Sequence, residues 1–132
     1  MKVEVNIQSS WKHLPLPGWE MCKVLSNLID NAVDALQEID GDRRLQITLT
    51  EDIRTYRFSV SNNGPMIPVR NQQSIFMPGV TTKSTGHGMG LFIAKQTLQD
   101  RGGDLVLVSD AEKTEFSGFI PKNAPMTTVD AE

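Results

Sequence analysis

Three alternating glycines, Gly86, Gly88 and Gly90, stand directly before an apolar helical pattern in the stretch V-T-T-K-S-T-G-H-G-M-G-L-F-I-A-K, residues 80–95. Glycine lets a ligand approach the main chain closely, and the free N–H groups and positive dipole end at a helix start favour an anion. Lys83 adds a positive charge nearby. The stretch predicts a phosphate-binding loop, although a flexible hinge before a helix would show the same glycines.

A second set of polar residues shares one side of a predicted helix in L-S-N-L-I-D-N-A-V-D-A-L, residues 25–36. At about 100° per residue, Asn27, Asp30, Asn31 and Asp34 fall within roughly a 100° arc. The opposite arc is apolar and should pack on a sheet: Met21, Leu25, Leu28, Ile29, Ala32 and Leu36. Mg²⁺ prefers oxygen ligands and keeps most of its waters, so one asparagine carbonyl plus substrate phosphates would suffice. A solvated helix face is the alternative, but asparagine is a poor helix former, which favours a ligand-binding role.

Four motifs, in this order along the chain, resemble those of the ATP-binding domain of sensor histidine kinases. They are the N-box, N-L-I-D-N-A at 27–32; the first glycine box, N-N-G-P-M-I-P at 62–68; the phenylalanine box, I-F-M-P-G-V-T-T-K at 75–83; and the second glycine box, G-H-G-M-G-L at 86–91. The wider superfamily includes gyrase-type topoisomerases and certain chaperone and mismatch-repair ATPases. Within it, the chain most resembles citrate and dicarboxylate sensors and the sporulation phosphotransferase.

The resemblance implies ATP and Mg²⁺ as cofactors and assigns roles to individual residues. Asn31 would ligate the metal, and Asn27 would lie beside the phosphates or the metal's waters. Lys83 and the three glycines would hold the triphosphate, while Asn62 and Gly64 would meet the adenine. Asn27, Asn31 and Lys83 form the implied catalytic set. The remaining nucleotide contacts implied are Asp34, Ile67, Phe76, Thr85, His87, Met89 and Leu91.

The first glycine box departs from the family pattern D-x-G-x-G. Asn62 replaces the adenine-reading carboxylate, and Met66 replaces the second glycine. An amide can accept from the adenine amino group, or flip and donate to guanine O6, so weaker base discrimination is expected. A degenerate domain of the same fold, a phosphotransfer or regulatory module without ATP binding, is the alternative. The intact second glycine box favours binding, because surplus glycine costs stability.

Only two histidines occur, His13 and His87. His13, in W-K-H-L-P, lacks the neighbours of a phosphoacceptor helix, and His87 lies inside the glycine box. The acceptor histidine is therefore expected on a separate phosphoacceptor and dimerisation domain of the same kinase, with a response regulator downstream. An ATPase or serine kinase of the superfamily is another alternative. Those relatives carry a glutamate one turn before the metal asparagine, where this chain has Asn27, which cannot abstract a proton.

Length and composition indicate one domain, residues 1–121, followed by a polar tail, 122–132, expected to be disordered. With a formal net charge of −3 and no basic run or aromatic-rich patch, the chain is not expected to bind nucleic acid. The single cysteine, Cys22, borders the apolar arc and is expected to be a small core residue. No signal peptide or membrane-length apolar run is found, which predicts a cytoplasmic domain without direct membrane contact, even within a membrane-anchored sensor.

Hydrophobic periodicity predicts the elements that position these residues. Strands are expected at 2–8, 45–51, 56–61, 104–109 and 115–120, and helices from 18 to about 37 and from 88 to 100, with a short helix around 70–76. Val3, Val5 and Ile7 should point inward. The expected fold class is α+β: a two-layer sandwich in which two long helices cover one face of a mixed sheet of about five strands. Residues 62–87 would form an ATP lid.

Overall fold

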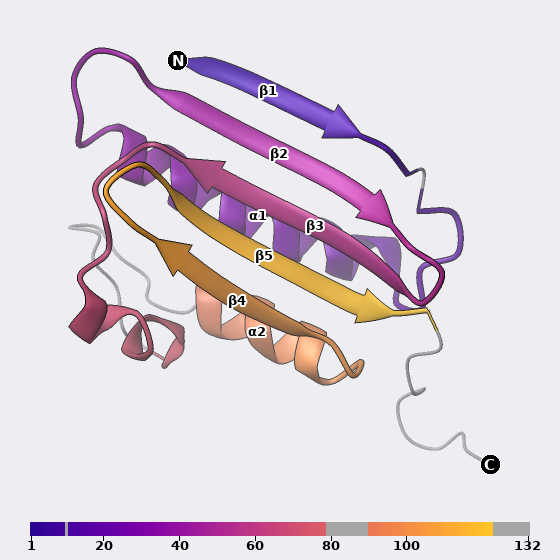
Figure 1. Ribbon diagram of the computed structural model, residues 1–132. Coiled ribbons are helices and arrows are strands. Elements are labelled where there is room, and N and C mark those ends of the chain that lie inside the picture. Colours follow the sequence, from indigo (N-terminus) through magenta and orange to yellow (C-terminus); the bar gives the residue numbers. More distant parts are fainter. Residues whose placement is uncertain (10, 79–89, 123–132) are drawn as a thin grey trace.

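The computed structural model describes residues 1–9, 11–78 and 90–122, and it shows one five-stranded sheet with two helices on the same face (Figure 1). The strands are β1 (Lys2–Ile7), β2 (Arg44–Glu51), β3 (Thr55–Asn62), β4 (Asp104–Ser109) and β5 (Thr114–Pro121), and the helices are α1 (Gly18–Leu36) and α2 (Gly90–Gln99). The strand order is β1-β2-β3-β5-β4. The predicted α+β two-layer fold is confirmed.

Chain connections explain why the sheet is mixed. The pairs β2–β3 and β4–β5 are antiparallel hairpins, whereas β1 runs parallel to β2 and reaches it through α1. On β5, alternate side chains are buried: Thr114, Phe116, Gly118 and Ile120. Because successive residues of a strand point to opposite faces, this alternation places one side of β5 against the helices.

The core lies between the sheet and one stripe of α1. Its buried residues, Met21, Val24, Leu28, Ala32 and Leu36, recur every three or four positions. They form one hydrophobic cluster with Phe58 and Val60 of β3, Phe116 and Ile120 of β5, and Ala94 and Leu98 of α2. Val24 is a core residue that the predicted apolar arc omitted.

The valines and isoleucine of β1 are on the predicted side of the sheet, but the burial implied by an inward orientation is wrong. Val3, Val5 and Ile7 are 53%, 54% and 62% exposed. In the parallel register they stand beside Leu45, Ile47 and Leu49, so they do lie on the helix-facing side of the sheet. They stay exposed because β1 is an edge strand and the core cluster between sheet and helices begins only at β2.

The core position predicted for Cys22 is also wrong, because its side chain is exposed. The buried stripe of α1 passes through Met21 and Val24. At about 100° per residue, Cys22 lies on the flank of that stripe. Sequence periodicity indicated that the residue borders the apolar arc, but the width of the covered stripe depends on tertiary packing.

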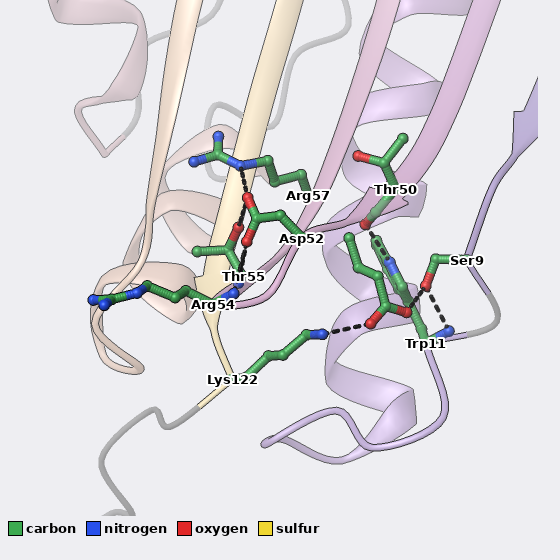
Figure 2. Close-up of polar contacts among 9 residues, drawn as sticks. Ser9, Trp11, Thr50, Asp52, Arg54, Thr55, Arg57 and Lys122 are labelled. Atoms are coloured by element: carbon green, nitrogen blue, oxygen red, sulfur yellow. Dashed lines mark hydrogen bonds and ion pairs between the residues drawn. The ribbon is translucent and has the colours of Figure 1, made fainter.

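A polar turn closes the β2–β3 hairpin, as Figure 2 shows. Asp52 accepts hydrogen bonds from the N–H of Arg54 (2.8 Å) and from the N–H (2.7 Å) and hydroxyl (2.9 Å) of Thr55, and it pairs with the Arg57 guanidinium. The Arg54 N–H, followed by the Thr55 hydroxyl and N–H, holds the pKa of Asp52 far below its ordinary value. This strong perturbation belongs to a structural turn.

The segment before α1 is fixed to the same end of the sheet (Figure 2). The Trp11 indole N–H donates to the carbonyl of Thr50 at 3.0 Å, and its ring packs edge-on against Tyr56 and Phe58. Ser9 and Lys122 both bond to the carboxylate of Glu51, which is the side chain drawn without a label. These contacts hold the segment before α1 and the end of β5 beside β2 and β3.

Between β3 and α2, the structure has two short 3₁₀ helices, η1 (Val69–Asn71) and η2 (Ser74–Phe76), in place of the single short helix predicted around 70–76. Residues 79–87 of the predicted lid lie outside the described residues, as do residues 88 and 89 at the start of the predicted second helix. So do residues 123–132 of the predicted tail, and β5 ends at Pro121.

Candidate nucleotide site

A cavity of about 160 Å³ lies between α1 and the end of β3 that is remote from the β2–β3 turn. Residues from α1, from the chain between 62 and 75, and from β5 line it. The lining residues are Asn31, Asp34, Ala35 and Glu38 from α1 and the turn after it, Asn62 from β3, Pro65 to Pro68, Ile75 from η2, and Thr114 from β5. The cavity therefore collects residues from three of the four motifs that the sequence singled out.

Asn62 is a buried polar residue of this cavity, with only 3% of its surface exposed. It ends β3 opposite Leu45 of β2 and Thr114 of β5, on the helix-facing side of the sheet. Its side-chain Oδ1 accepts a hydrogen bond from the N–H of Gly64 at 2.8 Å. Because a main-chain N–H can only donate, this bond determines which end of the amide is used.

Gly64 allows the chain to pass close to α1. A Cβ added there would lie 2.8 Å from the Asn62 Oδ1 and 3.0 Å from the Ala35 carbonyl oxygen. Both distances are shorter than ordinary van der Waals contacts, so any side chain would push the first glycine box away from the helix. The glycine keeps Asn62 and the last turn of α1 on the same cavity wall.

The two asparagines of α1 have different surroundings. Asn31 and Asp34 are half-buried and line the cavity, whereas Asp30 is exposed. Asn27 lies one turn earlier, and its Nδ2 donates to the carbonyl of Gly90 at 3.3 Å. The predicted polar arc therefore faces both the cavity and the first residue of α2.

A small hydroxyl network supports the cavity wall opposite α1. Ser109 Oγ lies 2.7 Å from Thr114 Oγ1 and accepts a hydrogen bond from the N–H of Ile67 at 2.9 Å. The Gln72 side chain donates to the carbonyl of Ile67 at 2.9 Å. Ile67, predicted as a nucleotide contact, thus has its main chain held on both sides.

Sequence reasoning missed Thr114, which is 2% exposed and lines the cavity. One signal could have found it, because it is the hydroxyl among the inward positions of β5, beside Phe116, Gly118 and Ile120. It also missed the contributions of Ala35, Glu38 and Ile75. These residues reach the cavity only through tertiary packing, so no local pattern marks them.

Phe76, another predicted contact, lies against a different space. It lines a larger cavity of about 550 Å³ with Phe92, Lys95 and Leu107. Its ring packs edge-on against Phe116, with centroids 6.0 Å apart, and the Lys95 ammonium lies 4.5 Å from the ring centroid. None of the asparagines of α1 lines this larger cavity. The smaller cavity, with its convergent amides, is the better candidate site despite its size.

Several predicted residues cannot be placed. Lys83, Thr85, Gly86, His87, Gly88 and Met89 lie outside the described residues. Gly90 is the first residue of α2, and Leu91 is half-buried against the core. The predicted phosphate loop thus ends where Asn27 bonds to α2.

The side chains around the cavity suit a polar organic ligand better than a metal ion alone. In residues 1–9, 11–78 and 90–122, no three histidine, cysteine, aspartate or glutamate side chains gather as a metal site. A metal held by the carbonyl of Asn31 would therefore need further oxygen ligands, which substrate phosphates supply. Asn31 and Asn62 both line the cavity, and the amide chemistry of their side chains fits a magnesium nucleotide. In the same described ranges, neither long helix is apolar and long enough to cross a membrane.

Comparisons with known proteins identify the family of the chain. Residues 20–124 match the family model described as histidine kinase-, DNA gyrase B- and HSP90-like ATPase. The chain is 29% identical over 129 residues to the sensory histidine kinase/phosphatase NtrB of Klebsiella oxytoca, covering 92% of this chain and 37% of that protein. It is 33% identical over 100 residues to the C4-dicarboxylate transport sensor protein DctB of Rhizobium meliloti, covering 76% of this chain and 16% of that protein.

Solved structures show the same architecture. The catalytic domain of histidine kinase ThkA superposes with a TM-score of 0.74 at 28% identity, covering 91% of this chain and 80% of that one. The mycobacterial sensor histidine kinase MprB shares the fold at 20% identity, with a TM-score of 0.72 over 95% of this chain and 85% of that one. The chain spans well under half the length of the curated relatives named above. It belongs to the histidine kinase-, DNA gyrase B- and HSP90-like ATPase family, and within that family to the ATPase domains of sensor histidine kinases.

Proposed function

We propose that this chain is the catalytic domain of a sensor histidine kinase, which binds ATP with Mg²⁺ and transfers the γ-phosphoryl group to a histidine on a separate phosphoacceptor domain. The observation that carries the proposal is the cavity in which Asn31 of α1 and the buried Asn62 of β3 converge. Membership of the kinase family supports it, because the relatives named above are sensor kinases.

Each described residue has a task in this proposal. Asn31 would hold the metal through its amide oxygen, and the metal, when bound, would neutralise charge on the phosphates. Asn62 and Gly64 would hold the base, with Thr114 behind it. Asn27 would keep the start of α2 beside the N-box helix through its bond to Gly90. Phosphoryl transfer needs mainly such positioning and charge neutralisation, so no proton-abstracting side chain is required on α1.

The charge of the residues that line the cavity indicates how the nucleotide is oriented. Among the described residues, its lining includes the acidic Asp34 and Glu38 and no lysine or arginine, which disfavours phosphates there. We therefore place the base in the cavity and direct the phosphates toward the second glycine box, with Gly86, Gly88, Lys83 and Thr85 as the proposed phosphate contacts.

The proposal places the partners outside this chain. The acceptor histidine would belong to a phosphoacceptor and dimerisation domain of the same kinase, with a response regulator downstream and a cytoplasmic location. The named relatives are sensor proteins in which the matched domain is a minor part of the whole length, which supports such a modular arrangement.

Isothermal titration with Mg·ADP tests the proposal. The parent protein should bind, and Asn31→Ala should weaken binding by several kcal/mol, because a metal ligand is lost. The matched control is Asp30→Ala, the exposed neighbour on the same helix, which should bind as the parent does. Equal binding by the parent and Asn31→Ala would show that the metal assignment is wrong. No binding by the parent would instead indicate a degenerate module of the same fold.

A further inference from the structure

The side chain of Asn62 is oriented by its own main chain, and this orientation has a chemical consequence. Its Oδ1 is 2.8 Å from the N–H of Gly64 and accepts that hydrogen bond. If the amide were flipped, two donors would face each other inside a buried site. Burying a polar group without a hydrogen bond is unfavourable, so the flipped form is disfavoured.

The other end of the amide, Nδ2, has no acceptor among the described residues. Asn62 is 3% exposed, so solvent reaches it poorly, and it lines the cavity proposed for the base. A buried NH₂ group without a partner is uncommon in folded proteins and calls for an explanation. A ligand that brings an acceptor to this point would supply the missing partner.

We infer that Asn62 presents its NH₂ group to the base, and that the pocket therefore accepts 6-oxopurine nucleotides, with guanine or hypoxanthine as the base, at least as well as adenine nucleotides. The inference rests on the proposed function for the placement of the base. The 6-oxo group is an acceptor and completes the bond from Nδ2, whereas the 6-amino group of adenine would set a donor against a donor.

Other residues that line the cavity also suit a 6-oxopurine base. A 6-oxopurine also carries a donor at N1, and the acidic residues Asp34 and Glu38 are among those that line the cavity. Carboxylates accept hydrogen bonds and, when ionised, cannot donate them. The pocket therefore combines a fixed amide donor with acceptor side chains, which matches the acceptor and donor edge of guanine or hypoxanthine.

Competition binding of Mg·ADP, Mg·IDP and Mg·GDP tests the inference. ADP and IDP differ only at the edge of the base that includes position 6. The parent should bind IDP as tightly as ADP or more tightly. Asn62→Asp keeps an oxygen for the Gly64 N–H and replaces the donor with an acceptor. Relative to the parent, this variant should favour ADP over IDP by about tenfold or more, as measured by the ratio of the two dissociation constants.

Two controls separate this effect from charge and from misfolding. Asn6→Asp makes the same amide-to-carboxylate change on exposed β1 and should leave the ratio unchanged. The amide proton of Gly64 should stay protected from exchange in Asn62→Asp, which shows that the turn is intact. In the parent, the side-chain NH₂ resonances of Asn62 should shift on saturation with Mg·IDP.

The outcomes are distinguishable. If the parent binds ADP at least tenfold more tightly than IDP, and Asn62→Asp leaves that ratio unchanged, the inference is overturned while the proposed function stands. If Asn6→Asp changes the ratio of the ADP and IDP dissociation constants as much as Asn62→Asp does, the change reflects overall charge, and the inference also fails. If none of the three diphosphates binds, the proposed function itself is wrong and the inference falls with it.

Discussion

The side-chain amide of Asn27 donates a hydrogen bond to the main-chain carbonyl of Gly90, 3.3 Å away, and so joins the middle of α1 to the first residue of α2. A Cβ added to Gly90 would make ordinary contact with the same asparagine, with its nearest atom 3.5 Å away. The two helices that frame the candidate site are thus connected at the point where the predicted phosphate loop ends.

The first prediction concerns this bond. Asn27→Asp should destabilise the fold by about 1–2 kcal/mol at pH 7, because a carboxylate would face the carbonyl oxygen of Gly90. Repulsion of the charged form raises the pKa of the new carboxyl, so the loss should be present above that pKa and should shrink as the pH falls through it. Urea unfolding at pH 7 and pH 4 measures both effects. Ser26→Asp, at an exposed position of the same helix, is the control, and an equal loss there would show that the Gly90 contact is not responsible.

The second prediction concerns the close approach at Gly64. Gly64→Ala should cost about 1–3 kcal/mol, because its Cβ would lie 2.8 Å from Asn62 Oδ1 and 3.0 Å from the Ala35 carbonyl oxygen. Binding of Mg·ADP should weaken as well, since the cavity wall shifts. Gly18→Ala is the matched control, because no atom lies within 4 Å of its added Cβ. If both variants unfold at the same urea concentration, the close packing around Gly64 has no energetic role.

The third prediction concerns catalysis by the isolated chain. Asn27 is an amide and cannot take a proton from water, and its NH₂ group is bonded to Gly90. Purified protein with Mg·ATP should therefore release phosphate at the rate of buffer alone and should not label itself. Phosphate release and transfer from γ-labelled ATP measure the two activities. Rapid release that Asn27→Ala abolishes would instead support an ATPase.

The fourth prediction concerns acid stability at the β2–β3 turn. Hydrogen bonds from the Arg54 N–H and then from the Thr55 hydroxyl and N–H lower the pKa of Asp52. A group with a lowered pKa stabilises the fold fully above its unfolded value, near pH 4, and loses this contribution as the pH falls further. Asp52→Asn should therefore be less stable than the parent at pH 7, with a difference that shrinks below about pH 4.

Urea midpoints at a series of pH values between 7 and 2.5 measure this difference. The control is Asp40→Asn, which alters an exposed aspartate in the connection between α1 and β2. A gap between the parent and Asp52→Asn that stays constant across the series would contradict the assigned role of the carboxylate.

Local patterns in the sequence were sufficient for most of the elements. The antiparallel hairpin of β2 and β3, the strand β4 and the long helix α1 follow from hydrophobic period, turn residues and proline positions, which act within a few residues of the chain. The four motifs likewise identified the family, because their order along the chain is itself a sequence property. The same reasoning failed at Val5 and Cys22, where exposure depends on which part of the sheet α1 covers.

The sequence by itself determined that Asn62 replaces a carboxylate, but it left both orientations of the amide open. Only the tertiary structure decided between them, because the N–H of Gly64 lies 2.8 Å from Oδ1 and can only donate. The same holds for Thr114, which lies just before the strand predicted at 115–120 and which the fold brings to the cavity. The physical reason is common to both residues. A side chain's type and its place on a strand are local properties, whereas its hydrogen-bond partner and its burial depend on groups that folding brings together.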